Sequence, residues 1–501
     1  MLQAYSAAAV RAAEQPLLSA GRGPELMRTA AHGLAMGVVS VLRSRGKGIY
    51  GANVVLLVGS GNNGGDALYA GAHLAARGAR TTALLTSART HPEALAAFGK
   101  SGGRCLVLGA DGAPVSFMDE ARQSDVVIDG LLGTGGSGGL REPVAGVVAL
   151  LAEFAGDGPA VVACDLPSGV DATTGEVHGP VLPADLTVTF GAHKTGLLSA
   201  PGEQSAGTVA LVDLGIGQQL GPPELSRLEA GDLAAFLPQP SAAAHKYTRG
   251  VAGVIAGSVQ YPGAGLLAVA AASACGPGMV RYLGPEQVAA AIHVRNPEVV
   301  CSQNSPDEVR VQAWLAGPGI DGDQAQLDRA AAAIASGLPT VVDAAALALV
   351  QPATQAATNE HLILTPHAGE LSALLARCGV LVSRAQIEAS PLAAARQAAA
   401  LLGAVVLLKG PTTIVAAPNG AVFTQANGTA RLATAGSGDT LAGILAALLA
   451  MSAGPIDLAR TAALAAALHG QLAQTDVEQP INAGLLAARI PAVWAALSQK
   501  R

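Results

Sequence analysis

Asp439 stands in a short polar stretch whose composition suits phosphate chemistry. The stretch reads Ala435-Gly436-Ser437-Gly438-Asp439, and the apolar residues from Thr440 to Leu449 after it predict a buried helix. Glycines before a helix leave backbone N–H groups free to face an anion, and the helix dipole adds to the attraction. Asp439 is then either an N-cap that satisfies free N–H groups, or a general base that takes a proton from an attacking hydroxyl.

A second glycine-rich stretch follows residues 53–58, a β-branched run that predicts a buried parallel strand. It reads Gly59-Ser60-Gly61-Asn62-Asn63-Gly64-Gly65-Asp66. The glycines match a dinucleotide-binding G-x-G-x-x-G, but no acidic residue ends the next predicted strand, which weakens the interpretation as a Rossmann oxidoreductase. The side-chain oxygens of Asn62, Asn63 and Asp66 suit a cation or sugar hydroxyls, or else form Asx turns.

Two later predicted strands end at carboxylates. Residues 125–129 end at Asp129 before a glycine-rich loop, and residues 160–165 end at Asp165 before Leu166-Pro167-Ser168-Gly169. Because ligands bind at the carboxyl ends of parallel strands, we expect these loops to meet around one site. Asp165 is alternatively the cap of the following turn. For Lys194, after the strand predicted at 187–190, exposure to solvent is one interpretation.

These ordered motifs resemble the NAD(P)H-hydrate epimerase domain, a Rossmann-like fold, over roughly residues 5–214. The resemblance implies that Asp165 sits at the reactive nicotinamide ring and that Asn63, Asp129 and Ser168 bind K⁺. It implies that the phosphates and ribose of the hydrated cofactor are held by Asn62, Asn63, Gly64, Gly65, Asp66, Gly133, Thr134, Gly135, Gly136, Ser137, Gly138 and Gly139. Ala67 replaces a frequent glycine and the glycine tract is extended, which we interpret as adjustments to substrate fit.

The chain after residue 244 carries two further strand-exit motifs. One is Thr365-Pro366-His367-Ala368-Gly369-Glu370 and the other is Lys409-Gly410-Pro411-Thr412-Thr413, each after an apolar run. His367 either orients a substrate and exchanges protons, or caps a helix. Lys409 either neutralises phosphate charge or is a snorkelling end residue.

Together with G-S-G-D, these motifs resemble the ribokinase-like fold, most closely its ADP-dependent NAD(P)H-hydrate dehydratase branch, over about residues 245–494. The resemblance implies that the adenine nucleotide is bound by Lys409, Gly410, Pro411, Thr412, Thr413 and Gly438. It implies that the hydrated cofactor contacts Ala264, Gly319, His367 and Asp439. The branch's usual proline is Ala368 here, and its D-A-D is Asp343-Ala344-Ala345.

Composition excludes several classes of protein. The 501 residues carry a net charge of −6 with only 13% charged residues, which argues against nucleic-acid binding. The apolar runs are too short for a membrane span, and the first residues lack the pattern of a secretory signal. Five scattered cysteines predict buried free thiols in a reducing cytoplasm.

We therefore expect an α/β protein with a Rossmann-like three-layer epimerase domain (1–218), a Pro- and Gly-rich linker (219–244) and a ribokinase-like dehydratase domain (245–501). The expected function is repair of NADHX and NADPHX: epimerisation of their R and S forms, then ADP-dependent dehydration of the S form. In that reaction Asp439 deprotonates the hydroxyl, the nucleotide phosphorylates it with Mg²⁺ assisting, and phosphate is eliminated. The alternative is a ribokinase-like small-molecule kinase with a non-catalytic N-terminal binding module. We also expect a cytoplasmic homo-oligomer.

Overall fold

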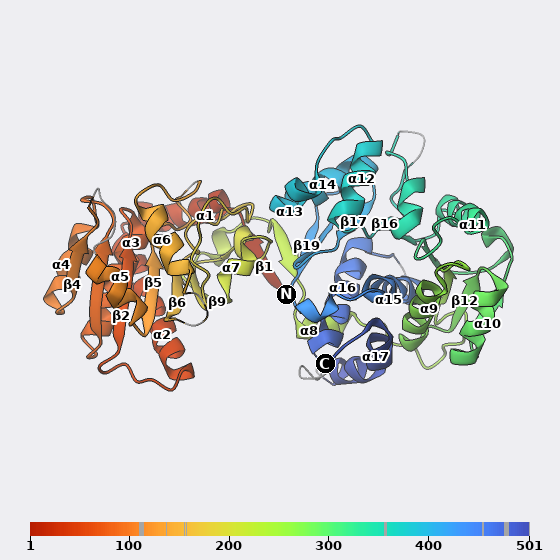
Figure 1. Ribbon diagram of the computed structural model, residues 1–501, viewed down its shortest axis with the longest axis horizontal. Coiled ribbons are helices and arrows are strands. Elements are labelled where there is room, and N and C mark those ends of the chain that lie inside the picture. The colour runs from red at the N-terminus through yellow and green to blue at the C-terminus, as the bar shows by residue number, and fades with distance from the viewer. Residues whose placement is uncertain are drawn as a thin grey trace. The chain divides into compact units, whose positions relative to one another are not determined.

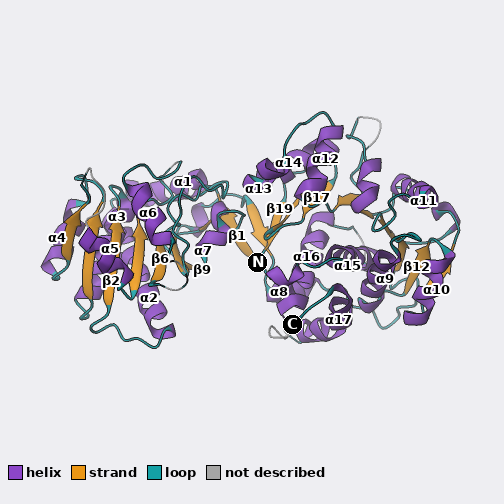
Figure 2. Cartoon of the chain, in the orientation of Figure 1, coloured by secondary structure: helices purple, strands orange, loops and turns teal. Residues whose placement is uncertain are grey.

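The computed structural model describes residues 1–109, 115–136, 138–154, 156, 158–354, 358–452, 455–474 and 480–499. The chain divides into two compact units, one of Gln3–Glu224 and one of Met1–Leu2 with Leu225–Arg501. Helices alternate with strands in both units (Figures 1 and 2), so the predicted α/β class is confirmed. Of the segment predicted as a linker, Leu225–Arg227 forms strand β10 and Ala230–Phe236 forms helix α8.

The first unit is built on a parallel seven-stranded sheet of order β4-β3-β2-β5-β6-β7-β9. The strands are β2 (Asn53–Val58), β3 (Arg80–Leu85), β4 (Arg104–Val107), β5 (Val126–Gly130), β6 (Ala160–Cys164), β7 (Leu186–Phe190) and β9 (Thr208–Val212). Beside them, β1 (Leu2–Tyr5) pairs in parallel with β8 (His193–Lys194). The strand predicted at 53–58 has the observed bounds, as its continuous apolar run requires for burial on both faces.

Helices cover both faces of this sheet. They are α1 (Ala7–Ser19), α2 (Gly23–Ser44), α3 (Asn62–Ala75), α4 (Pro92–Lys100), α5 (Val115–Arg122), α6 (Val144–Ala152) and α7 (Glu203–Ala206). Leu56 packs in one core with α2, α3 and α4, whereas the neighbouring Val55 and Leu57 pack in another with α5 and α6. The alternation of strand side chains therefore produces a three-layer unit.

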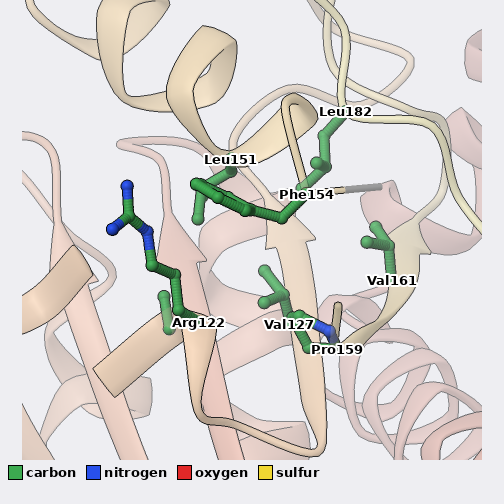
Figure 3. A pocket seen from close by; sticks show the side chains of 8 residues that line it. Arg122, Val127, Leu151, Phe154, Pro159, Val161 and Leu182 are labelled. Atoms are coloured by element: carbon green, nitrogen blue, oxygen red, sulfur yellow. The ribbon is translucent and has the colours of Figure 1, made fainter. Parts of the chain in front are cut away.

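At the rim of the core under α5 and α6, the exposed Arg122 lies over the partly buried ring of Phe154. Figure 3 shows the side chains of Arg122, Leu151, Phe154, Val127 and Val161 around a very small pocket. The Arg122 guanidinium lies 4.2 Å from the centroid of the Phe154 ring. Both residues of this cation–π contact line the pocket, which is too small for anything larger than a water molecule.

The second unit contains a sheet of order β13-β12-β11-β14-β15-β16-β17-β18-β19-β10, parallel from β13 to β17 and antiparallel across β17, β18 and β19. The strands are β11 (Val251–Ile255), β12 (Met279–Leu283), β13 (Val300–Ser302), β14 (Ala313–Ala316), β15 (Thr340–Val342), β16 (Leu362–Leu364), β17 (Val405–Leu408), β18 (Thr413–Ala416) and β19 (Val422–Gln425). The strand β10 pairs in parallel with β19.

Its helices are α8, α9 (Pro262–Ala274), α10 (Glu286–Arg295), α11 (Gln324–Ala335), α12 (Ala368–Arg377), α13 (Arg384–Ala389), α14 (Pro391–Leu402), α15 (Ser437–Met451), α16 (Leu458–Gln474) and α17 (Ala483–Ser498). The predicted buried helix is α15, which packs closely against α9. A Cβ added at Gly443 would lie 2.3 Å from the Ala268 carbonyl oxygen, so the small residues set this close approach. None of the described helices is long and apolar enough to cross a membrane.

Candidate active sites

A cavity of about 530 Å³ lies at the carboxyl ends of β2, β5 and β6 in the first unit. Its walls come from the start of α3, from the loop after β5, and from α1 and α2. The volume is in the range of small-molecule sites. The predicted site residues that line it are Asn62, Asn63, Asp66, Gly133, Thr134, Gly135, Gly136 and Asp165.

Other predicted residues of this half have different surroundings. Gly64 and Gly65 are buried at the start of α3, and a Cβ at Gly64 would lie 2.1 Å from the Gly59 carbonyl oxygen. This close approach explains the need for glycine at position 64. Gly138 has a left-handed backbone (φ 73°), and Gly139 lies against the carbonyl of His178. Ser137 lies outside the described residues.

Asp165 is held by donors on both carboxylate oxygens. Its Oδ1 accepts hydrogen bonds from Lys194 Nζ at 2.5 Å and from Thr189 Oγ1 at 3.2 Å. Its Oδ2 accepts from the backbone N and the Oγ1 of Thr134, at 2.9 and 2.5 Å. Burial alone would raise the pKa of Asp165, but Lys194 and Thr134 outweigh it and lower that pKa. Asp165 is therefore an ionised carboxylate at the cavity wall.

Lys194 is not solvated, and that interpretation is wrong. Its side chain is 1% exposed, and besides Asp165 its Nζ donates to the Thr189 hydroxyl at 3.0 Å and to the Phe190 carbonyl at 2.7 Å. The three N–H donors of the buried ammonium group therefore have three acceptors, as a buried lysine requires. Lys194 is thus a buried partner of Asp165, which the sequence alone did not reveal.

Hydrogen bonds join two of the three residues predicted to bind K⁺, Asp129 and Ser168. Asp129 is buried, and its carboxylate accepts from the hydroxyl and backbone N of Ser168 at 2.6 and 2.8 Å. Burial, opposed by these bonds, raises the pKa of Asp129. No cation among the described residues pairs with it. Asn63 Nδ2 is buried without a hydrogen-bond partner, and its Oδ1 would lie 2.8 Å from a Cβ at Gly133.

A second group of charged side chains lies at the carboxyl ends of β15, β16 and β17 in the other unit. Lys409 Nζ is 2.8 Å from Asp343 Oδ1 and 3.7 Å from Glu370 Oε2. Burial lowers the pKa of Lys409, but Asp343, Glu370 and Asp439 outweigh it and raise that pKa. Lys409 therefore carries a fixed positive charge beside the start of α15, 3.6 Å from an ideal Cβ on Gly438.

Asp439 belongs to the first turn of α15, not to the loop before it. The helix begins at Ser437, with Gly436 as its N-cap in a left-handed conformation (φ 85°). The boundary differs from the prediction because Gly436 turns the chain three residues earlier, so the interpretation of Asp439 as the N-cap is wrong. Burial and the Asp343 carboxylate raise the pKa of Asp439 to about 6, against the opposing effect of Lys409. A carboxylate with this pKa can exchange protons near neutral pH.

The remaining predicted residues of the second unit follow three strands: Ala264 comes after β11, Gly319 after β14, and residues 410–413 after β17. Ala264 and Gly319 meet, since a Cβ at Gly319 would lie 2.6 Å from that of Ala264. After β17, Gly410 and Pro411 are exposed, Thr412 is buried and Thr413 begins β18. The backbone of Lys409 pairs with the segment of His367 through a parallel bridge.

His367 caps helix α12, which confirms the capping interpretation of its Nδ1. This nitrogen accepts from the backbone N of Gly369 and of Glu370 at 3.0 and 3.2 Å, and Glu370 Oε2 accepts from the His367 backbone N at 2.8 Å. A capping Nδ1 leaves the proton of neutral His367 on Nε2. Its side chain is 58% exposed, with Nε2 3.6 Å from Glu370 Oε2, so the ring edge faces solvent beside a carboxylate.

His469 is a second residue that sequence reasoning missed. It lies on α16, it is buried, and its Nε2 is 3.2 Å from Ser437 Oγ. Burial lowers the pKa of His469 to about 4, so it is a neutral hydrogen-bond partner. It fixes Ser437 at the start of α15. The sequence did not predict this contact because the two residues are far apart along the chain.

Two α/β units, each with a carboxylate and a buried or half-buried lysine at its strand ends, define a two-domain enzyme with one site in each unit. The family model described as "NAD(P)H-hydrate dehydratase" matches residues 252–492, and that described as "YjeF-related protein N-terminus" matches residues 23–196.

Relatives cover both units. The bifunctional NAD(P)H-hydrate repair enzyme Nnr of Mycobacterium tuberculosis is 43% identical over 89% of either chain. The NAD(P)H-hydrate epimerase of Clavibacter michiganensis is 46% identical over 42% of this chain and 90% of its own. A crystal structure of ADP/ATP-dependent NAD(P)H-hydrate dehydratase from Bacillus subtilis, co-crystallised with ATP and Mg²⁺, is 28% identical, with a TM-score of 0.49 over 55% of this chain and 99% of that one.

The chain belongs to the family of bifunctional NAD(P)H-hydrate repair enzymes. The resemblance drawn from the sequence motifs is thereby confirmed, as is the predicted pairing of a Rossmann-like domain with a ribokinase-like domain.

Proposed function

We propose that this protein repairs hydrated nicotinamide cofactors, with epimerisation in the first unit and nucleotide-dependent dehydration in the second. One observation carries the proposal: each unit places a carboxylate at its strand ends beside a lysine, Asp165 with Lys194 and Asp439 with Lys409. The relatives named as bifunctional repair enzymes and as an epimerase support this division of work.

Dehydration must replace a poor leaving group by a good one. The substrate carries a hydroxyl on ring carbon 6, and hydroxide leaves slowly. Asp439 takes the hydroxyl proton, the freed oxygen attacks the terminal phosphorus of ADP, and AMP leaves. Electrons of the ring nitrogen then expel phosphate, and loss of the C5 proton restores the double bond of the reduced nicotinamide. The pKa of Asp439 near 6 keeps it mostly ionised at pH 7, as a base must be.

The nucleotide is proposed to lie against Lys409, Gly410, Pro411, Thr412, Thr413 and Gly438. Lys409 neutralises phosphate charge, and the N-terminal amides of α15 stabilise the charge that develops on the transferred group. The hydrated cofactor is proposed to contact Ala264, Gly319 and His367. The meeting of Ala264 with Gly319 and the exposed side chain of His367 support this assignment.

Mg²⁺ is proposed to travel with the nucleotide. Asp343, Glu370 and Asp439 surround a single lysine, so phosphates entering here need a further cation. This ion is held mostly by phosphates and water with one or two carboxylates, which the acidic residues beside Lys409 can supply. It would draw charge from the transferred phosphoryl group.

In the first unit, Asp165 is proposed as the catalytic carboxylate and the loop residues 62–66 and 133–139 as the cofactor's phosphate and ribose site. K⁺ is proposed to bind Asn63, Asp129 and Ser168. The buried Asp129 carboxylate has no cationic partner among the described residues, and neighbouring oxygens of Ser168 and of the Leu132 carbonyl are ligands suited to K⁺. A cytoplasmic location and homo-oligomeric assembly stay predictions.

The test is to incubate the purified protein with chemically hydrated NADH and either ADP or ATP. Recovery of the absorbance of the reduced ring, with release of equimolar inorganic phosphate, is the expected result. A small-molecule kinase would instead leave phosphate on an organic product, and the ring absorbance would not return.

A further inference from the structure

Asp66 is a buried acidic residue of the first cavity with no ion-pair partner in the described part of the chain. It lies near the start of α3, lines the cavity together with Asp165, and is 8% exposed. Its Oδ1 is buried and has no hydrogen-bond partner. No ion pair joins it to any cation of the described chain. Buried polar atoms without partners are rare, and at a cavity wall they point to a ligand.

Three carboxyl side chains line the cavity, those of Glu14, Asp66 and Asp165, and the two aspartates differ in electrostatic environment. Lys194 is bonded to Asp165 and not to Asp66. Burial, and then the Asp165 and Glu14 carboxyls, raise the pKa of Asp66 well above its ordinary value. The other charged group at this end of α1 is Arg11, which donates to the Thr134 carbonyl at 2.7 Å. The charged form is therefore favoured at Asp165 and disfavoured at Asp66.

Unequal carboxyls in one cavity are the arrangement that inversion at a carbon bearing a hydroxyl requires. One group must give a proton to the departing oxygen, and another must take a proton from the oxygen that returns on the opposite face. Asp165, tied by Lys194 and Thr134, is suited to accept. Asp66 Oδ1 has no hydrogen-bond partner among the described residues, so a proton on Asp66 is suited to donation to the substrate.

We propose that Asp66 is the general acid of the epimerase cavity and acts with Asp165 as the general base, an inference that rests on the proposed function. The Asp66 proton passes to the C6 hydroxyl as the C6–O bond breaks, the ring nitrogen's electron pair forms a double bond to C6, and water leaves. Water then adds to C6 from the opposite face, the nitrogen recovers its electron pair, and Asp165 takes the added water's proton. Exchange with solvent restores both groups, so atoms and electrons balance.

This role differs measurably from simple substrate binding, the role predicted for Asp66 from the sequence. A binding residue lowers KM, so its loss raises KM and leaves kcat nearly unchanged. A general acid acts in the transition state, so its loss lowers kcat. Because an acid must be protonated to act, epimerisation by the wild-type protein must also decline as pH rises through the pKa of Asp66.

The experiment compares Asp66→Asn with Asp119→Asn, a substitution of an exposed residue on α5 of the same unit. The rate of epimer interconversion above the uncatalysed rate is followed by chromatography of hydrated NADH without nucleotide. We expect Asp66→Asn to lower kcat by about 10²- to 10⁴-fold with KM within about threefold, and to remove the alkaline decline. Asp119→Asn retains the wild-type profile.

Unchanged kcat with a raised KM, or a persisting alkaline decline in Asp66→Asn, overturns the proposal. Dehydration of the separated S epimer with ADP measures the second unit and is expected to be unaffected. If Asp66→Asn does not fold, the wild-type pH profile decides alone, because an absent alkaline decline overturns the assignment. Failure of the wild-type protein to interconvert epimers contradicts the proposed function itself and is therefore distinguishable.

Discussion

Lys194 and Asp165 form an ion pair that is almost completely removed from solvent. The Nζ and Oδ1 atoms are 2.5 Å apart, and the side chains are 1% and 8% exposed. Such a pair adds little stability compared with apolar packing, but removal of one partner leaves an uncompensated buried charge. Substitution of either residue should therefore disturb the cavity of the first unit.

We expect Lys194→Met to destabilise the first unit by about 3–5 kcal/mol, because Asp165 loses its cation. Both tryptophans, Trp314 and Trp494, belong to the second unit, so their fluorescence follows that unit while far-UV circular dichroism follows both. In Lys194→Met, part of the dichroism transition should move to a lower denaturant concentration, whereas the fluorescence transition should keep its wild-type midpoint. Lys100→Met, at an exposed site on α4, is the matched control. Unmoved dichroism would show that the pair is dispensable.

The dehydratase reaction should have an acidic limb set by Asp439. A general base acts when ionised, so kcat/KM should rise with pH through about 6 and then level off. Asp343 raises this pKa, so Asp343→Asn should shift the limb to lower pH at saturating nucleotide. A pH-rate profile on the S epimer measures both. A limb that moves to higher pH in Asp343→Asn would contradict the assigned electrostatics.

The pH dependence of protein stability should reveal the raised pKa of Asp439 independently of catalysis. A pKa raised on folding stabilises the folded protein below the unfolded-state pKa, and that stabilisation is lost as pH rises through about 6. The free energy of unfolding of Asp439→Asn should therefore exceed that of the wild type by about 1–3 kcal/mol above pH 7. Near pH 4 the two free energies should be similar. Tryptophan fluorescence follows the transition. Equal stability at both pH values would mean that Asp439 is not perturbed.

Potassium should stabilise the first unit through Asp129. Replacement of K⁺ by a bulky organic cation at constant ionic strength should slow epimerisation and lower the dichroism midpoint, because the buried carboxylate loses its counterion. Asp129→Asn should remove the response to K⁺, whereas Asp119→Asn should keep it. An undiminished K⁺ response in Asp129→Asn would exclude this carboxylate as a ligand.

Gly133 should be essential for the shape of the first cavity. A Cβ there would lie 2.8 Å from Asn63 Oδ1 and 3.1 Å from Asp165 Oδ2, so Gly133→Ala must displace one of these groups. We expect a loss of epimerisation of at least about tenfold with dehydration of the S epimer unchanged. The control is Gly99→Ala, where a Cβ meets open space. Full epimerase activity in Gly133→Ala would mean that the cavity tolerates this displacement.

Much of the architecture was predictable because it depends on local pattern. The apolar run of residues 53–58 permits only a buried strand, and the glycines around Gly64 mark a close backbone approach. The environments of charged side chains were not predictable in this way. Lys194 follows a strand as solvated lysines often do, and only the packing of Thr189, Phe190 and Asp165 around it shows its burial.

The start of α15 shows the same limit. Its composition predicts a helix with an anion-binding end, but the conformation of Gly436 decides which residue begins it. His469 contacts Ser437 from a different helix, 32 positions along the chain, and no local pattern encodes that contact. Contacts between distant segments follow from the assembled sheet and not from spacing.

The central claim is that two separate sites act on the same damaged cofactor. It is tested most directly by resolving both epimers of hydrated NADH over time with Asp439→Asn and Asp165→Ala proteins in the presence of ADP. Asp439→Asn should interconvert the epimers without restoring NADH, and Asp165→Ala should dehydrate the S epimer and leave the R epimer to its uncatalysed rate. Dehydration by Asp439→Asn, or equal loss of both activities in either variant, would contradict the account.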